Sequence, residues 1–322
     1  MLNSFQLTIQ NGDTIYEPLV EEGIEWETER KGVPGKLAFK VLKDTVLDFT
    51  EGNIVRLQVN GANVFYGYVF TKKRDKDGVI SVTAYDQLRY LKNKDCYMYP
   101  TAMTASELIK ALAADYQLKV GEIEDTEYII QKRVEDNSTL FDIIQTALGL
   151  TLDNKKKLYV LYDDFGKLTL KNIESMLINL LIDAETAENY DYTSSIDSNT
   201  YNQVKLFYDN KDTGARELYK AFSGANIARW GVLQYCDSIG EKTNGQAKAD
   251  ALLGMYNRKT RSLSITNAFG DIRVRAGTSV GIQLDLGDIT VNKYMLVEKA
   301  KHVFTNNQHL MSLSLKGRDI YE

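Results

Sequence analysis

Residues 52–59 read GNIVRLQV, and residues 277–284, near the other end of the 322-residue chain, read GTSVGIQL. In each segment a glycine leads into a run whose apolar side chains alternate with polar or small ones, the pattern of a half-buried β-strand. Because the same pattern stands at both ends of the chain, it indicates an internal repeat whose two members fold alike.

A β-hairpin is expected after each member of this repeat. The matching segments are 66–73 with 294–301 and 79–86 with 310–319. The offset between the members drifts from 225 residues to about 233, which insertions in loops absorb. Short strands separated by glycine turns are typical of small barrels and sandwiches. We therefore predict two similar small β-barrels.

Between the two β-rich ends, the apolar spacing becomes that of helices. Thr104 and Glu107 form a capping box ahead of one apolar stripe, and a second helix is expected from about Ser138 to Gly149. We predict a mainly β chain with an α+β insertion, divided into a first β-barrel (1–95), a compact α+β domain (96–175) and a second β-barrel with one helix (176–322).

Composition excludes several classes of protein. The chain has 39 basic and 44 acidic side chains and a formal charge of −5, so a strongly basic nucleic-acid binder is not expected. The longest apolar run, 176–182, is far shorter than the ~20 residues of a membrane-spanning helix. No basic-then-apolar signal stands at the start, so we expect synthesis in the cytoplasm and no membrane insertion.

The sequence offers no recognisable catalytic or ligand-binding motif. It contains neither a GxxxxGK[ST] nor a GxGxxG loop, and its two cysteines lie too far apart for a CxxC pair. The two histidines flank a predicted turn at 305–308, which would set His302 opposite Met311 and His309 opposite Phe304. A zinc site is therefore not expected. We predict no catalytic residue, no cofactor and no metal, and hence a protein that is not an enzyme.

An acidic stretch precedes the last third of the chain. Residues 172–204 contain six acidic side chains and neither lysine nor arginine. The stretch is either a solvated linker leading into a strand, or a surface that faces another polyanion without binding it. The candidates for such a surface are Asp183, Glu185, Glu188 and Asp191.

Trp230 lies in a segment rich in glycine, alanine and asparagine. A tryptophan in this setting either belongs to a core or lid, or anchors an interface. Arg229 precedes it, and arginine is also enriched at the centres of interfaces. Arg229 and Trp230 are therefore interface candidates.

Four segments together resemble a known family. They read FYGYV (65–69), TAYDQLRYL (83–91), DNSTLFDII (136–144) and ARWGVLQ (228–234). In this order and spacing they resemble XkdQ/YqbQ-type proteins of phage-like elements in Gram-positive bacteria. These are relatives of the late control gene D baseplate hub proteins of contractile tails, and the similarity covers about residues 1–320.

The resemblance implies a homotrimeric ring in the baseplate of a virion or of a bacteriocin-like, phage-tail-like particle. Two barrels per subunit would form a pseudo-sixfold collar. The collar would dock on the hexameric tail tube protein, hold the central spike protein below, and contact other baseplate proteins. The acidic candidates would then line a lumen and make at most passing contact with DNA.

Two other functions stay open at this point. One is a cell-wall-degrading or cell-wall-binding tail-tip enzyme. The other is a spike-like component of a phage-derived injection machine without a genome. A structural hub is the leading hypothesis, because the duplicated strands fit that role independently of the resemblance.

Overall fold

The computed structural model is mainly β, with 50% of the chain in strands and 18% in helices. The described residues form two compact units, one within 4–191 and 264–317, the other within 192–263. The predicted turn at 305–308 and the predicted hairpin end at 319 include residues outside the described ones. The structure describes residues 4–21, 23–197, 199–211, 213–240, 244–287, 289–305 and 308–317.

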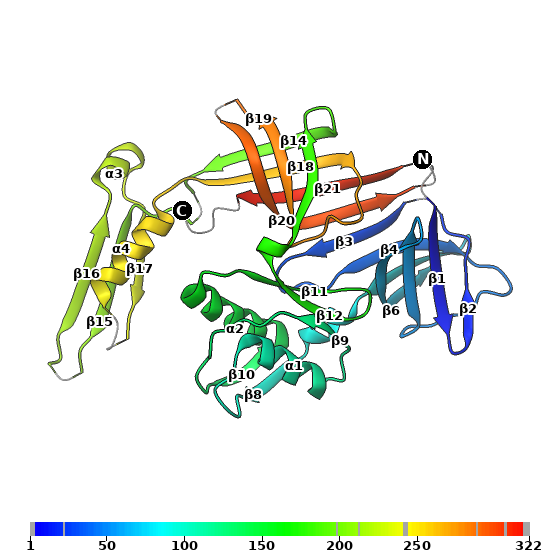
Figure 1. Ribbon diagram of the computed structural model, residues 1–322, viewed down its shortest axis with the longest axis horizontal. Helices are drawn as coiled ribbons and strands as arrows, with labels where there is room; N and C mark the ends of the chain where they lie inside the picture. The colour runs from blue at the N-terminus through cyan, green and yellow to red at the C-terminus, as the bar shows by residue number, and fades with distance from the viewer. Residues whose placement is uncertain are drawn as a thin grey trace. The chain divides into compact units, whose positions relative to one another are not determined.

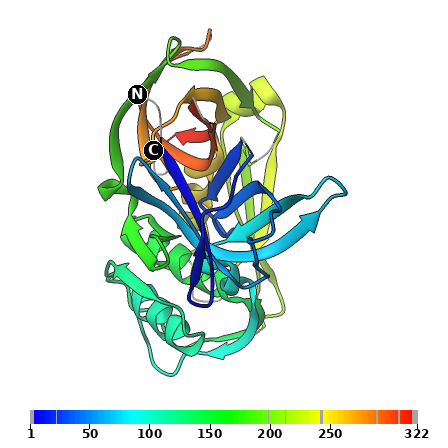
Figure 2. The same ribbon diagram turned by 90° about the vertical axis from the view of Figure 1, so that its right-hand side faces the viewer.

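The N-terminal part of the first unit, residues 5–85, is built from strands alone (Figure 1). In β5 the side chains of Val55, Leu57 and Val59 are buried, and those between them are only half-buried, as the alternating sequence predicts. The hairpin of β6 and β7 extends away from the rest of this N-terminal part (light blue in Figure 2). The strands are β1 (Phe5–Asn11), β2 (Thr14–Tyr16), β3 (Ile24–Glu29), β4 (Lys36–Leu42), β5 (Ile54–Val59), β6 (Ala62–Arg74) and β7 (Val79–Tyr85).

An α+β lobe follows, with its own hydrophobic core between two helices and a three-stranded sheet of β11, β12 and β9. The capping box is present: Thr104 Oγ1 accepts from Glu107 N, and the Glu107 carboxylate accepts from Thr104 N at 2.8 Å. The second helix continues through Gly149 to Lys155. The elements are η1 (Gln87–Lys92), β8 (Lys94–Met98), α1 (Ala105–Asp115), β9 (Val120–Ile123), β10 (Val134–Thr139), α2 (Leu140–Lys155), β11 (Tyr159–Asp163), β12 (Leu168–Asn172) and η2 (Ile173–Ser175).

The last third of the chain returns to strands and completes the first unit. Its strands are β13 (Leu177–Asp183), β14 (Ala187–Ser195), β18 (Thr260–Phe269), β19 (Ser279–Asp285), β20 (Thr290–Phe304) and β21 (His309–Gly317), of which β14 and β18 carry the chain between the units. Strand β20 pairs with β3 over six residues, from Lys299↔Glu29 to Phe304↔Ile24. This pairing joins the two β-rich ends into one 13-stranded sheet.

The mainly β prediction is confirmed, but the two barrels stay a prediction. Among the described residues the hydrogen-bonded strands form no closed barrel. The predicted domain limits at residues 95 and 175 likewise stay a prediction.

The turn that enters β5 has a specific geometry. Gly52 has a φ of +87°, a conformation that glycine adopts without steric cost. Its N–H donates to Val69 O at 2.8 Å, and Val69 N donates back to Asn53 O at 2.9 Å. Asn53 N also closes the turn by donating to Thr50 O. Immediately beyond, the β6–β7 register shifts between Val69 and Thr71.

The turn that enters β19 repeats this geometry. Gly277 has a φ of +96° and donates to Val297 O at 2.8 Å, while Val297 N donates to Thr278 O at 2.8 Å. Thr278 N donates to Arg275 O, and the β20–β21 register shifts between Val297 and Lys299. Turn, reciprocal hydrogen bonds and bulge therefore recur together at the positions that the sequence repeat aligns.

The second unit is a small α+β layer. Its sheet has the order β16-β15-β17, and α4 packs on one face through Ala249, which contributes to a core with Val204 and Leu206. The elements are β15 (Gln203–Asp209), β16 (Arg216–Phe222), α3 (Gly224–Trp230), β17 (Gln234–Ser238) and α4 (Gly245–Tyr256). In neither unit is any described helix long and apolar enough to cross a membrane.

Two glycine substitutions test the account of packing. A Cβ at Gly67 would lie 2.3 Å from Tyr85 O, so Gly67→Ala forces the backbone of β6 and β7 apart. We expect a loss of about 1–3 kcal/mol in the free energy of unfolding, measured in urea. A Cβ at Gly149, within α2, would meet nothing within 4 Å, and Gly149→Ala should gain about 0.5–1 kcal/mol. If the free energy of unfolding changed in the same direction in both variants, this account of packing would be contradicted.

Candidate functional site

A buried charged junction connects three parts of the first unit. Arg275, in the turn before β19, is partly exposed as a residue, but its Nε atom is buried. Its Nη2 donates to Asp163 O at 2.8 Å, and its guanidinium carbon lies 4.0 Å from the centre of the Tyr162 ring. The next residue, Ala276, donates its N–H to Thr28 Oγ1 on β3 at 2.9 Å. One turn therefore contacts both β11 and β3.

Two carboxyl groups belong to the same junction. Asp86, directly after β7, accepts from Gly35 N at 2.9 Å and from Leu88 N at 3.0 Å. Asp163, at the end of β11, accepts from Gly166 N at 2.6 Å. Burial raises the pKa of Asp163 to about 6. Burial, and then the charge of Asp163, raise the pKa of Asp86 well above its usual range.

Paired carboxyls with raised pKa values are also a feature of acid–base catalysts. Here, however, the cavity beside Asp86 and Arg275 has a volume of only about 10 Å³, the size of about one water sphere. A substrate polymer does not fit. The arrangement suits a structural role, in which the Arg275 cation and the carboxyls of Asp86 and Asp163 hold the N-terminal strands, the C-terminal strands and the α+β lobe together.

The two histidines form a second buried polar group. The predicted pairs His302↔Met311 and Phe304↔His309 are confirmed. The rings nevertheless touch, with His302 Nδ1 2.8 Å from His309 Nε2, because diagonal positions on one face of a hairpin are also neighbours. His302 also stacks on Trp26 of β3, at a centroid distance of 4.9 Å.

The hydrogen bonds assign the protons of this pair. His302 Nε2 lies 2.8 Å from Val274 O, which can only accept, so His302 carries its proton on Nε2 and accepts at Nδ1 from His309. Burial, and then the neighbouring ring, lower the pKa of His302 to about 3, and burial lowers that of His309 to about 4. No group of three or more metal-ligating side chains occurs in the part of the chain that the structure describes.

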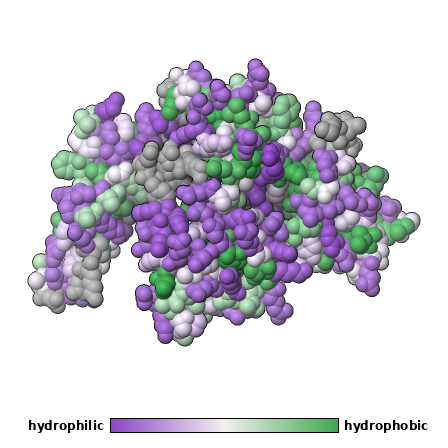
Figure 3. All heavy atoms as spheres, in the orientation of Figure 1, coloured by the Kyte–Doolittle hydropathy of each residue, from purple (hydrophilic) through white to green (hydrophobic). Residues whose placement is uncertain are grey.

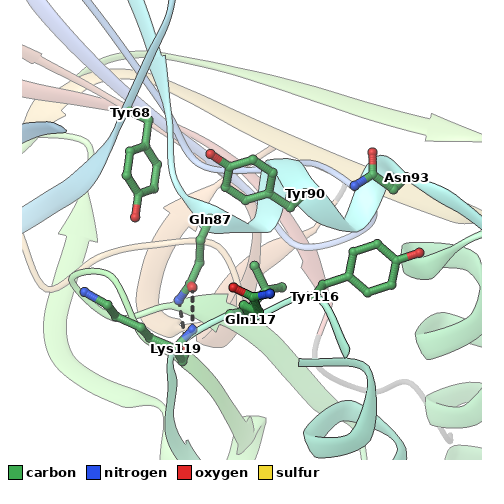
Figure 4. A pocket seen from close by; sticks show the side chains of 8 residues that line it. Tyr68, Gln87, Tyr90, Asn93, Tyr116, Gln117 and Lys119 are labelled. Atoms are coloured by element: carbon green, nitrogen blue, oxygen red, sulfur yellow. Dashed lines mark hydrogen bonds between the residues drawn. The ribbon is translucent and has the colours of Figure 1, made fainter. Parts of the chain in front are cut away.

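An open pocket of about 350 Å³ lies between the N-terminal strands and the α+β lobe (Figure 4). Tyr68 of β6 and Tyr90 of η1 stand on one side, and Gln117 stands on the other. Gln87 joins the two sides: its carboxamide donates to Lys119 O and accepts from Lys119 N, both at 3.0 Å. The lining is completed by Asn93, Tyr116 and Leu118. Pockets at the boundary of two lobes are common binding sites.

The four acidic candidates differ in what they contact. Asp183 holds the turn between β13 and β14, since its Oδ1 accepts from the N–H groups of Glu185 and Thr186. Glu188, on β14, accepts from Asn267 Nδ2 at 2.5 Å. Glu185, Glu188 and Asp191 are exposed, whereas Asp183 is half-buried. Their role in a lumen stays a prediction.

Arg229 and Trp230 end α3 in the second unit. Arg229 is exposed and Trp230 is half-buried, and no residue of this helix is buried. Their role at an interface stays a prediction. The sequence did not single out Arg275 or the pocket. Two of the pocket's tyrosines, Tyr68 and Tyr90, lie within the segments FYGYV and TAYDQLRYL, whose dense aromatic pattern was the available signal.

The arrangement of strands around an α+β lobe is a phage tail-like fold. The fold matches that of the prophage MuSo2 43 kDa tail protein from Shewanella oneidensis, with a TM-score of 0.72 at 13% identity, over 98% of this chain and 100% of that one. It also matches the E. coli c3393 protein, a type VI secretion component described as structurally similar to T4 tail proteins gp27 and gp5. That match has a TM-score of 0.58 at 10% identity and covers 98% of this chain and 77% of that one.

Sequence comparison gives the family. A family model described as YQBQ-like matches residues 24–316. Two proteins of Bacillus subtilis (strain 168) are each 29% identical, with 94% of both chains covered: the uncharacterized protein YqbQ over 315 residues and the phage-like element PBSX protein XkdQ over 313. The chain belongs to the YQBQ-like family, which confirms the resemblance found in the sequence.

The histidine pair predicts a specific pH dependence. In the unfolded chain each imidazole has a pKa near 6.5, and in the folded chain the values are about 3 and 4. Between pH 6.5 and 4 these two histidines therefore bind more protons in the unfolded state, and their contribution to the free energy of unfolding falls as the pH is lowered. The raised pKa values of Asp86 and Asp163 act in the opposite direction. The loss is at most about 1.4 kcal/mol per pH unit for each histidine.

The variant His309→Gln removes the titration of one of the two histidines, because glutamine still offers a donor to His302 Nδ1 but does not titrate. We expect its slope between pH 6.5 and 4.5 to be shallower by up to about 1.4 kcal/mol per pH unit. Urea unfolding of both proteins at several pH values measures this difference. All other groups are shared, so identical slopes would show that His309 is not held neutral by the fold.

Proposed function

We propose that this chain is a structural baseplate hub, and that three copies form a pseudo-sixfold ring joining a hexameric tail tube to a central spike. The observation that carries the proposal is the repeated turn, reciprocal hydrogen bonding and bulge at Gly52 and Gly277. Two segments that share such irregular details have the same local backbone structure, although their surroundings differ: Gly52 is exposed, whereas Gly277 is buried.

The duplication matters for symmetry, because it sets the number of similar surfaces in a ring. A threefold ring of chains that each carry one similar surface offers three sites, whereas a chain with two offers six. Three copies can therefore meet a sixfold tube with equivalent contacts. The two similar barrels predicted from the sequence belong to this proposal.

The relatives support a tail function. One is assigned to a phage-like element, one is a prophage tail protein, and one is a type VI secretion component likened to phage tail proteins. A shared fold does not by itself transfer function, so the tube, the spike and other baseplate proteins are proposed as partners. The location in a virion or phage-tail-like particle is part of the same proposal.

A non-enzymatic role is also part of the proposal. The carboxyl group of Asp86 borders a cavity that holds about one water, so it does not face a substrate cleft. The open pocket is lined by tyrosine and carboxamide side chains and by Lys119, and Gln87 within it is already hydrogen-bonded. These side chains suit binding better than acid–base chemistry.

For DNA passing through such a ring, the acidic surface around β14 would act by repulsion. Glu185, Glu188 and Asp191 are exposed and close in sequence, and no lysine or arginine occurs between residues 172 and 204. A lumen of the same charge as the phosphate backbone lets the duplex slide without binding. Asp183 is left out of this surface because its carboxylate holds the turn.

The hub is tested by its mass in solution. Size exclusion with light scattering, over a range of concentrations and with and without tail tube protein, should show a species near three times 36.5 kDa. With tube protein, this species should enter a larger complex. A chain that stays monomeric under both conditions contradicts the proposal, and release of soluble peptidoglycan fragments by the purified chain would favour the cell-wall enzyme.

The lumen is tested by charge reversal. A particle carrying Glu185→Lys, Glu188→Lys and Asp191→Lys should assemble normally but release DNA at least several-fold more slowly, since the phosphates then bind the wall. The control Asp13→Lys, Asp77→Lys and Asp153→Lys makes the same change in net charge at exposed positions elsewhere. Equal release rates in the two particles would refute a role in the lumen.

A further inference from the structure

The open pocket has the chemistry of a peptide-binding notch. The rings of Tyr68 and Tyr90 meet edge to face, with centroids 6.0 Å apart and planes at 63°. Two rings inclined in this way form a notch, whereas a flat ring platform is what stacks on a sugar. Aromatic-lined notches bind extended proline-containing peptides, whose shape is largely fixed before binding.

Hydrogen-bonding groups surround the notch. Burial raises the pKa of Tyr68 to about 12 and also raises that of Tyr90, so both hydroxyls stay protonated and can donate to peptide carbonyls. The exposed side chains of Asn93 and Gln117 add two carboxamides on opposite sides of the opening (Figure 4).

The backbone at Gln117 supports a role for its side chain. Gln117 has a φ of +54° directly after α1, where glycine or asparagine is the usual residue. A longer side chain at such a position costs stability. Glycine would suit the backbone better but would leave the pocket without this carboxamide.

Charge favours an acidic ligand. Lys92, Lys94 and Lys119 are exposed on the segments that form the pocket. They outnumber the carboxyls near Tyr116, which are Asp115 and Asp95, and Asp95 already accepts from the Tyr116 hydroxyl at 3.2 Å. The face drawn in Figure 3 is mostly hydrophilic over the lobe of α1 and α2. The ligand should therefore be a short extended segment that combines proline with a carboxylate, rather than a large apolar surface.

We propose that the pocket binds the Glu17-Pro18-Leu19 segment of a second copy of this chain. The segment lies between β2 and the bridge of Val20 with Val41, outside any strand. Proline fixes its own φ and keeps Glu17 extended. Leu19 is 69% exposed although apolar, and Leu42 N donates to Leu19 O at 3.1 Å, which holds the segment in place before binding.

The other prolines fit less well. Pro34 is buried, and Pro100 is exposed but has no acidic residue beside it. Glu17 already accepts from Gln6 Nε2, but at 3.4 Å this bond is long and exposed, so it can exchange for a lysine of the second copy.

This proposal rests on the proposed ring in one respect, since copies must meet. Binding itself is tested apart from assembly, with a fluorescein-labelled peptide of residues 13–21 (DTIYEPLVE). Fluorescence anisotropy is measured against the full chain, at protein concentrations below those at which copies associate. We expect saturable binding that weakens at least tenfold for the Pro18→Ala peptide.

Variants of the chain locate the site. Tyr90→Ala should weaken binding at least tenfold, while Tyr294→Ala, which removes an exposed tyrosine of β20, should not change it. Gln117→Gly should weaken binding while the urea midpoint stays equal or rises, so that loss of binding cannot be ascribed to unfolding. The Tyr90 variant is checked by its own urea midpoint.

The outcomes separate the two proposals. Absence of saturable binding, or binding that survives both Tyr90→Ala and Gln117→Gly, overturns the pocket assignment even if the trimer forms. Displacement of the peptide by soluble peptidoglycan fragments would make the pocket a saccharide site and overturn it as well. Peptide binding by a chain that forms neither a trimer nor a tube complex would support the pocket and count against the ring.

Discussion

The first unit depends on the placement of one guanidinium group. Arg275 donates to the backbone at the end of β11 and lies against the Tyr162 ring. A charge in such a place is tolerated only when its surroundings compensate it. Its neighbours Asp86 and Asp163 supply this compensation: burial raises the pKa values of both carboxyls, and the charge of Arg275 opposes that rise. The α+β lobe is thereby attached to strands from both ends of the chain.

The repeated turns show how one local structure serves two purposes. At residues 275–278 the turn carries Arg275 into the junction, and a Cβ at Gly277 would lie 2.7 Å from Val160 Cγ1 of the lobe. At residues 50–53 the same turn has Thr50 in the place of Arg275, and a Cβ at Gly52 would meet nothing within 4 Å. The backbone is shared, while the side chains determine that only one copy of the turn holds the lobe. The other copy of the turn is exposed at Glu51 and Gly52.

Local patterns predicted the elements well and their long-range partners poorly. The alternation in residues 54–59, the cap at Thr104 and the pairing of His302 with Met311 all follow from neighbours close in sequence. The pairing of β3 with β20 joins residues more than 250 positions apart, and no periodicity reports such a contact. The contact between the two histidine rings joins diagonal neighbours, which the predicted pairing of directly opposed residues does not report.

The sequence by itself determined the class of secondary structure, the order of the elements, the repeat and the family, because each of these is written in the spacing of apolar side chains and glycines. The tertiary structure alone decided that the two β-rich ends share one sheet, that Asp183 holds a turn, and that tyrosines from β6, η1 and the end of α1 surround one pocket. Those outcomes depend on which distant surfaces pack together. Packing is a property of shape and burial in three dimensions, which alternation along a chain does not encode.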